Sequence, residues 1–357
     1  RGQTALAWNL VDYIAPASIF GELITSRTTA RAHTSGRPDV ETNTPGVALT
    51  PLERTSSGQH IGYSNVTVEI DRGLGTATIS IAAPRHVQPG DGASLAAAGD
   101  QSWLLRTARE LDDAILHLRF NETSIGTWVF TTTGDTNAVA QAEAVMNADP
   151  DHWLVREVHL FWTRVLKRLD VSARTLITAV EPGSCFCGIL AELLLVADRS
   201  FMLEGTWEDD DDPPPAATIQ LTAANRMFPM SNGLTRLETR FWQRPDALKA
   251  ALDASGIALD AAASMAVELV TFTPDDLDWH DELRLTYEER NSFSPDALTA
   301  MEANYRFVGP ETMETKIFSR LSAWQNWIFQ RPNAVGPQGA LQRFGTGSRP
   351  SFDNRRV

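Results

Sequence analysis

One short stretch of the chain strongly limits the folds that are open to it. Residues 174–180 form an apolar run with several β-branched side chains, which is typical of a buried strand, and a loop ending at Gly188 follows. Residues 189–197 are then almost entirely aliphatic and stop at Asp198, which predicts a helix buried on most sides. A strand that passes through a glycine-containing loop into a buried helix is typical of an α/β protein.

Strands and helices alternate along the region between residue 61 and Asp198. Two β-branched runs with a glycine-containing turn between them predict a hairpin, and apolar residues at helical spacing follow it. Because helices separate the later strands, we expect parallel strand pairs joined by right-handed crossovers. The predicted strands are 66–70, 76–81, 127–132 and 174–180, and the predicted helices are 103–118, 151–169 and 189–197.

The charge balance limits the partners of this chain. It carries 31 basic and 45 acidic side chains, which give a formal net charge of −14, and residues 1–60 hold five of each kind. The acidic excess therefore lies after residue 60, and neither nucleic acid nor an anionic membrane is an expected partner. No stretch of eighteen uncharged apolar residues occurs, so we expect no membrane span.

Metal and thiol chemistry have no clear motif. Cys185 and Cys187 are too close in sequence for an ordinary disulfide and lack the second ligand pair of a zinc site, which indicates a reducing, cytoplasmic compartment. Cys187 precedes a helix and could be activated, although a buried, inert thiol is favoured. The acidic residues 208–212 could hold a hard cation, but their spacing favours a solvated turn. The seven histidines show no ligand spacing, so we expect no metal.

Composition divides the chain into four parts. Residues 31–60 are rich in Thr, Ser, Gly and Pro and predict a linker, with an ordered arm as the alternative. The opening residues, with Leu10-Val11 after a small-residue helix, echo a later stretch that begins at Gly256 and reaches Leu269-Val270. Chance is the alternative, but a real echo would make residues 1–30 the end of a preceding repeat, and the absence of an initiator Met agrees with a fragment. The other two parts are a core, 61–243, and a helical region, 244–357, whose aromatic residues suggest packing against a partner.

The order of these elements resembles the crotonase, or enoyl-CoA hydratase/isomerase, superfamily. The features that carry the likeness are the hairpin, the strand ending at Thr133-Gly134, the helix ending at Ala197-Asp198, and the segment Phe228 to Leu237. The resemblance implies an α/β fold, a crotonase-like spiral of ββα units followed by a helical C-terminal region.

Within the superfamily, four segments in residues 181–341 resemble the benzoyl-CoA-dihydrodiol lyases, whose chains are longer and contain two crotonase-like halves. The resemblance implies a cytoplasmic, homodimeric lyase of benzoate degradation. Such an enzyme opens the ring of 2,3-epoxybenzoyl-CoA with water and gives 3,4-dehydroadipyl-CoA semialdehyde and formate. It implies no cofactor, since coenzyme A arrives with the acyl-CoA substrate. The alternatives are a non-catalytic structural or dimerisation half of that enzyme and a generic enoyl-CoA hydratase or isomerase.

The resemblance also assigns candidate site residues. Crotonase chemistry uses two backbone N–H groups that stabilise the thioester oxyanion, and the matching positions here are Ile189, beside Gly188, and the strand end at Gly134. Glu192 matches the first catalytic glutamate of the superfamily. Two departures weaken the assignment, because Gly-Gly-Gly is replaced by Gly188-Ile-Leu and Thr222 stands where many hydratases carry a second glutamate.

These departures lead to a mechanistic hypothesis. Catalysis would lie mainly in another half of the protein, and this half would serve as scaffold and dimer surface. Ser292 and Asn225 are candidates for polar groups lent across an interface, although Ser292 lies beside a predicted helix N-cap, Ser294, and Asn225 could simply satisfy a turn. Glu192 is either catalytic or a buried partner of Arg236. An open cavity at Gly188 would favour catalysis, whereas filling of that space by Phe186, Ile189 and Leu190 would favour the structural role.

Overall fold

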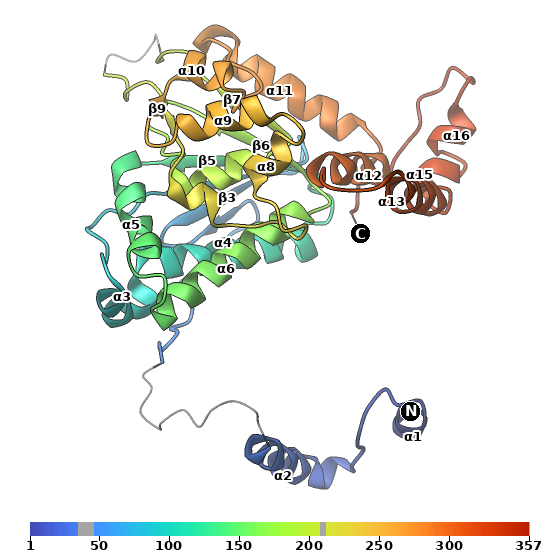
Figure 1. Ribbon diagram of the computed structural model, residues 1–357. Helices are drawn as coiled ribbons and strands as arrows, with labels where there is room; N and C mark the ends of the chain where they lie inside the picture. Colours follow the sequence, from blue (N-terminus) through green and yellow to red (C-terminus); the bar gives the residue numbers. More distant parts are fainter. Residues whose placement is uncertain (35–45, 208–211, 357) are drawn as a thin grey trace. The chain divides into compact units, whose positions relative to one another are not determined.

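A computed structural model describes residues 1–34, 46–207 and 212–356 of the chain. The chain divides into two compact units, Arg1–Val47 and Ala48–Val357. The second unit holds the sheets and the candidate site (Figure 1).

A seven-stranded sheet forms the centre of the second unit, with the strands in chain order from one edge to the other. The first three strand pairs are antiparallel, and the predicted hairpin is the β3–β4 pair. The last three pairs are parallel, as expected from the intervening helices. The strands are β1 (Thr55–Ser56), β2 (His60–Gly62), β3 (Val66–Asp71), β4 (Thr76–Ala82), β5 (Thr127–Thr133), β6 (Thr175–Val180) and β7 (Arg199–Met202).

Helices connect the parallel strands and cover the sheet (Figure 1). Helices α4 (Trp103–Asn121) and α6 (Trp153–Asp170) lie where the apolar spacing predicts them, and the buried indole of Trp162 donates a hydrogen bond to the carbonyl of Leu104. Helix α5 (Thr136–Ala148) was not predicted. The aliphatic run forms a single turn of 3₁₀-helix, η3 (Gly188–Leu190), and then α7 (Ala191–Val196).

The chain after α7 folds back onto the same body. Strands β8 (Ile219–Gln220) and β9 (Ala258–Leu259) form a second small sheet, and an isolated bridge joins Cys187 to Gln220. The helices after α7 include η4 (Ala223–Arg226), α8 (Arg236–Arg240), α9 (Pro245–Asp253), α11 (Asp276–Ser292), α12 (Pro295–Arg306), α13 (Met313–Lys316), η5 (Ile317–Ser322), α14 (Ala323–Ile328), α15 (Pro332–Val335) and α16 (Ala340–Arg343). Earlier in the chain are η1 (Ala17–Ile19), α3 (Gly92–Ala98) and η2 (Gly99–Gln101). The predicted helical region after residue 244 therefore also contributes β9 to the core.

The predicted linker, residues 31–60, is shorter in the structure. Helix α2 (Phe20–His33) continues into it, and residues 35–45 lie outside the described part of the chain. From Ala48 the chain belongs to the second unit. The amide and hydroxyl of Thr50 both donate to the carboxylate of Asp100, at 2.6 and 2.7 Å, and β2 pairs with β3. Tertiary contacts therefore hold the later half of this polar segment.

The echo between the opening residues and a later stretch is present in the backbone. Helix α1 (Gly2–Ala7) and helix α10 (Ala261–Ala266) have six residues each, and both are followed by a non-glycine residue in the left-handed region, Asn9 and Glu268, each with φ of 57°. At the same offset of 259 residues, Leu10-Val11 matches Leu269-Val270, and residues 17–33 match α11. The register differs from the one predicted, because Gly256 precedes β9 and lies outside the helix.

The two copies of this element differ in what surrounds them. In the second unit, Leu269, Val270, Trp279 and Leu283 are buried. Their counterparts in the first unit, at positions 10, 11, 20 and 24, are apolar but 41–69% exposed. The first element therefore has the local structure of the second without a sheet to pack on in its own unit.

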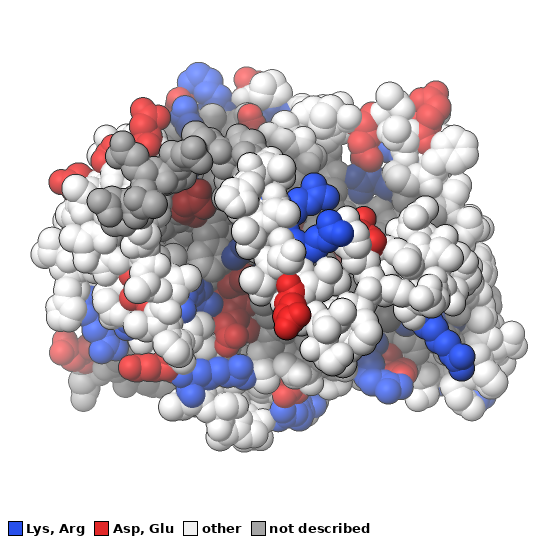
Figure 2. Space-filling view, turned by 90° about the horizontal axis from the view of Figure 1, so that it is seen from below, with Lys and Arg blue, Asp and Glu red and all other residues white. Residues whose placement is uncertain are grey.

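Charged side chains on the face shown in Figure 2 occur in small groups of both signs among mostly uncharged ones. No helix in the described residues has both the length and the apolar composition needed to cross a bilayer.

Candidate functional site

The carboxyl ends of the parallel strands bring together the loops in which the candidate amides lie. Gly134 follows β5 directly, and its φ of 122° is one that favours glycine. Its N–H donates to the carbonyl of Gly183, in the loop after β6, at 3.0 Å. This amide is therefore already used to join two loops.

The second candidate amide is occupied by a carboxylate of the same chain. The N–H of Ile189 donates to Oε2 of Glu143, on helix α5, at 2.6 Å. The other oxygen of Glu143 accepts a hydrogen bond from the hydroxyl of Thr222 at 2.5 Å. A thioester oxygen placed on the Ile189 amide would have to displace this carboxylate.

Gly188 is the position that permits this arrangement. Its φ is 48°, and a Cβ built there would lie 2.0 Å from Oε1 of Glu143. The side chains of Phe186, Ile189 and Leu190 are fully buried and fill the surrounding space. A filled space at Gly188 is the outcome that the sequence analysis associated with a structural role, so the structure favours that role for this turn.

The cavity beside Gly134 does not include the other candidate amide. Gly134 lines a cavity of about 660 Å³ together with Arg85, His86 and Asp135. Neither Gly188 nor Ile189 belongs to that lining. The paired donors that crotonase chemistry requires are therefore not presented to a common ligand in this unit.

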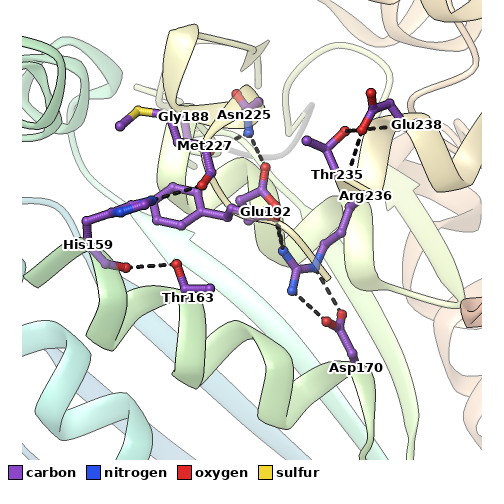
Figure 3. A network of polar contacts seen from close by, with 11 residues as sticks. His159, Thr163, Asp170, Gly188, Glu192, Asn225, Met227, Thr235, Arg236 and Glu238 are labelled. Atoms are coloured by element: carbon purple, nitrogen blue, oxygen red, sulfur yellow. Dashed lines mark hydrogen bonds and ion pairs between the residues drawn. The ribbon is translucent and has the colours of Figure 1, made fainter. Parts of the chain in front are cut away.

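Glu192 lies in a fully buried ion network, shown in Figure 3. Its Oε2 accepts from the guanidinium of Arg236 at 2.8 Å, and its Oε1 accepts from the side-chain amide of Asn225 at 2.8 Å. Arg236 also makes two hydrogen bonds to Asp170, at 3.0 and 2.8 Å. Asn225 donates in addition to the carbonyl of Gly188, also at 2.8 Å.

The electrostatics of this network follow from its burial. Loss of solvation raises the pKa of Glu192, and the charge of Arg236 and the hydrogen bond from Asn225 oppose that shift. Burial also raises the pKa of Glu143 to about 7, because desolvation outweighs the hydrogen bonds from Thr222 and Ile189. Both oxygens of each carboxylate have protein partners, so neither has an oxygen aimed at an approaching water.

Of the predicted site residues, the structure brings Gly188, Ile189, Glu192 and Asn225 together and leaves Ser292 apart. The hydroxyl of Ser292 donates to the carbonyl of Glu289, and its neighbour Asn291 lies against Gly75. Gly75 precedes β4, so Ser292 lies near the amino ends of the parallel strands, whereas Gly134 and Gly188 lie near their carboxyl ends. Ser294 caps helix α12, as the sequence suggested.

Two buried carboxylates of the site, Glu143 and Asp170, were not among the site residues predicted from the sequence. Val139, Ala142, Glu143 and Met146 share the buried face of α5, so Glu143 occupies a position where an apolar residue is expected. That break in the apolar pattern is a usable signal. Asp170 is the last residue of α6, where an acidic side chain opposes the helix dipole, and that position was a second usable signal.

The remaining polar motifs do not extend the site. Cys185 and Cys187 are buried free thiols, and burial raises the pKa of Cys187 to about 12. Among residues 1–34, 46–207 and 212–356, no group of three His, Cys, Asp or Glu side chains is arranged to hold a metal. Most of the acidic run 208–212 lies outside the described residues.

Solved structures establish the fold class. An enoyl-CoA hydratase from Geobacillus kaustophilus matches 85% of this chain and 100% of its own, with a TM-score of 0.56 and 17% identity. An enoyl-CoA hydratase from Bacillus anthracis matches 82% of this chain and 100% of its own, with a TM-score of 0.57 and 13% identity. The chain has the crotonase fold.

A comparison of sequences finds a relative of higher identity than these two structures. The chain is 46% identical over 358 aligned residues to benzoyl-CoA-dihydrodiol lyase from Aromatoleum evansii, and the match covers 100% of this chain and 63% of that protein. The chain is thus similar over its whole length to part of a longer lyase. No family model matches it.

Proposed function

We propose that this chain is part of an acyl-CoA lyase that opens the ring of 2,3-epoxybenzoyl-CoA with water to give 3,4-dehydroadipyl-CoA semialdehyde and formate. The support is the similarity to benzoyl-CoA-dihydrodiol lyase along the full 357 residues, together with the crotonase fold. Coenzyme A enters as part of the substrate, and the activity needs no resident cofactor.

Within that enzyme, this unit acts as a structural half and catalysis takes place in another crotonase-like half. One observation carries this proposal, namely the carboxylate of Glu143 on the Ile189 amide. A crotonase oxyanion carries negative charge, and a carboxylate already bound to the donor opposes it by occupancy and, when ionised, by repulsion. Loss of a single oxyanion donor costs about 2.7–4 kcal/mol of transition-state stabilisation.

The first unit fits the same division of the protein. Residues 2–33 repeat the backbone of 261–292, which packs on the central sheet of the second unit. Residues 1–30 would accordingly be the end of a preceding crotonase-like half, where the exposed side chains at positions 10, 11, 20 and 24 would become buried.

The helices after α12 supply a surface for a second copy of the protein. Met313, Phe318, Leu321, Leu341 and Phe344 are all more than half exposed, and exposed apolar side chains of this size are typical of an interface. The proposed enzyme is a cytoplasmic homodimer that uses this region for contact.

The test compares formate release from 2,3-epoxybenzoyl-CoA by the complete protein and by this chain alone. We expect turnover only in the complete protein. We also expect Glu192→Gln and Ser292→Ala in the complete protein to leave kcat within about twofold, provided that the protein remains folded. Comparable turnover by this chain alone, or a loss of more than 100-fold in kcat in well-folded Glu192→Gln, would overturn the structural role.

A control reaction distinguishes the ring-opening lyase from a generic enoyl-CoA hydratase or isomerase. If the complete protein hydrates a simple enoyl-CoA thioester such as crotonyl-CoA and does not release formate from the epoxide, the ring-opening assignment fails. The fold and the structural role of this half would still stand in that case.

A further inference from the structure

A second cavity, of about 610 Å³, lies beyond the C-terminal end of α7, away from the turn at Gly188. Side chains of α8, the end of α11 and the last turns of α12 line it. Arg236 and Asp170 contribute to its wall, whereas Glu143, Gly188 and Ile189 do not. The volume lies within the range of about 300–1,000 Å³ that is usual for small-molecule sites.

Two cations in the wall form no close ion pair among the described residues, although Glu268 lies near Arg240 and Glu302 lies near Arg290. Arg290 is 8% exposed, its Nε is buried without a hydrogen-bond partner, and neither Arg290 nor Arg240 forms an ion pair within the described part of the chain. Arg240 donates only to the carbonyls of Glu268 and Leu269. Burial of a guanidinium that has no close ion pair is costly, so an anion bound beside Arg290 would stabilise it.

The carboxylates in the same wall are already engaged. Asp170 is paired with Arg236, and Asp198 is paired with Arg306. Glu302 accepts from the hydroxyl of Thr175 and lies 3.8 Å from Arg306. Burial raises the pKa of Glu302 to about 7, and the charges of Arg306 and Arg290 oppose that shift. Four arginines and three acidic residues line the cavity, so its wall holds more positive than negative groups.

The rest of the wall is suited to an organic ligand. The hydroxyl of Thr239 is buried and has no partner, and it lies in the same lining as Arg290. Val196 and Met230 are buried apolar side chains, while Met301 and Tyr305 are 38% and 74% exposed and mark the mouth. A cation and a free hydroxyl beside apolar side chains match a carboxylate on an apolar body better than they match an inorganic anion.

We propose that this cavity binds a small organic carboxylate, with the carboxylate paired to Arg290 and hydrogen-bonded to Thr239, and the apolar body against Val196 and Met230. The site is independent of the amide turn at Gly188 and of the proposed ring-opening activity. Its ligand class is defined by the wall alone.

The test is isothermal titration calorimetry of the 357-residue chain with benzoate and hexanoate. Inorganic phosphate serves as the comparison anion. We expect both carboxylates to bind and phosphate to bind at least tenfold more weakly. Arg290→Met should weaken carboxylate binding at least tenfold in protein that still shows a cooperative thermal unfolding transition. Arg244→Met, which removes an exposed cation outside the cavity, should leave binding unchanged.

A second variant keeps the test decisive if Arg290→Met does not fold. Met301→Trp fills the mouth while every charged side chain remains, and it should also abolish binding. The absence of carboxylate binding to the unmodified chain, equal binding of phosphate, or full binding by Met301→Trp would each overturn the proposal.

Discussion

The side-chain carboxylate of Glu143 lies 2.6 Å from the backbone nitrogen of Ile189, on the turn where the crotonase resemblance places an oxyanion donor. Helix α5 thus delivers a carboxyl group to the amide that a ligand would otherwise use. The same side chain explains why residue 188 is glycine, since any Cβ there would meet the carboxylate.

The buried carboxyl of Glu143 should make stability depend on pH. In the unfolded chain this group loses its proton near its ordinary pKa of 4.5, whereas the folded chain holds the proton until about pH 7. Its contribution to stability is therefore complete below about pH 4.5 and falls as pH rises to 7, by up to about 3 kcal/mol. Glu143→Gln does not titrate and should lack this loss. Urea unfolding at pH 5 and pH 7.5 measures the difference between the two proteins, and equal pH dependence would contradict the assignment.

Replacement of Gly188 should destabilise the chain more than replacement of an unhindered glycine. Gly188→Ala places a side chain in a left-handed position and displaces Glu143, so we expect a loss of about 3–5 kcal/mol from strain and a broken buried hydrogen bond. Gly233 also has a positive φ but no atom within 4 Å of its Cβ position, so Gly233→Ala should cost only about 1–2 kcal/mol. Equal losses in chemical denaturation would show that Glu143 does not occupy the space beside residue 188.

Removal of Arg236 should strongly destabilise the second unit. Arg236→Met leaves Asp170 and Glu192 buried without their cation, and breaking a buried pair in this way costs about 3–5 kcal/mol. The exposed pair of Arg244 and Glu268 provides the control, since Arg244→Met should cost less than about 1 kcal/mol. The two variants differ in burial rather than in the type of residue removed. Similar free energies of unfolding for both would contradict the buried network.

The division into two units predicts that residues 48–357 fold without residues 1–47. No strand of the central sheet comes from the first unit, so we expect the shortened chain to keep a Tm within about 2 °C of the 357-residue chain. Differential scanning calorimetry measures this directly. A shortening that begins at residue 61 removes β1, the contact of Thr50 with Asp100, and His60 of β2, and it should lower Tm clearly. A large fall in Tm on removal of residues 1–47 would contradict the division.

Much of the central fold could be predicted because its signals are local. The hairpin, α4 and α6 have apolar patterns of period 2 or 3.6, while β5 and β6 are short runs rich in apolar and β-branched residues. The structure places all of them within a few residues of the predicted bounds. Helix α5 was missed because its buried face is interrupted by Glu143, which weakens the apolar pattern. The linker was placed too far along the chain, because polar composition does not reveal that Thr50 anchors to Asp100, fifty residues away.

The candidate site was predictable only in part. The resemblance to crotonases identified Gly188, Ile189 and Glu192 as candidates and provided their possible roles. The pairing of Glu192 with Arg236 was one of two alternatives, and the structure shows that contact at 2.8 Å. Ser292 was included on residue type alone, and the fold places it near the other ends of the strands.

By itself, the sequence determined the α/β character of the chain, the order of its strands and helices, and the glycine turn before a buried helix, because periodicity and turn residues act over a few neighbouring positions. Only the tertiary structure decided what that turn can bind. Glu143 is 46 residues from Ile189, and Arg236 is 44 residues from Glu192, so their contacts depend on how α5 and α8 pack around η3 and α7. The packing fills the amide turn with a carboxylate of the chain itself, and no local pattern around residue 188 contains that information.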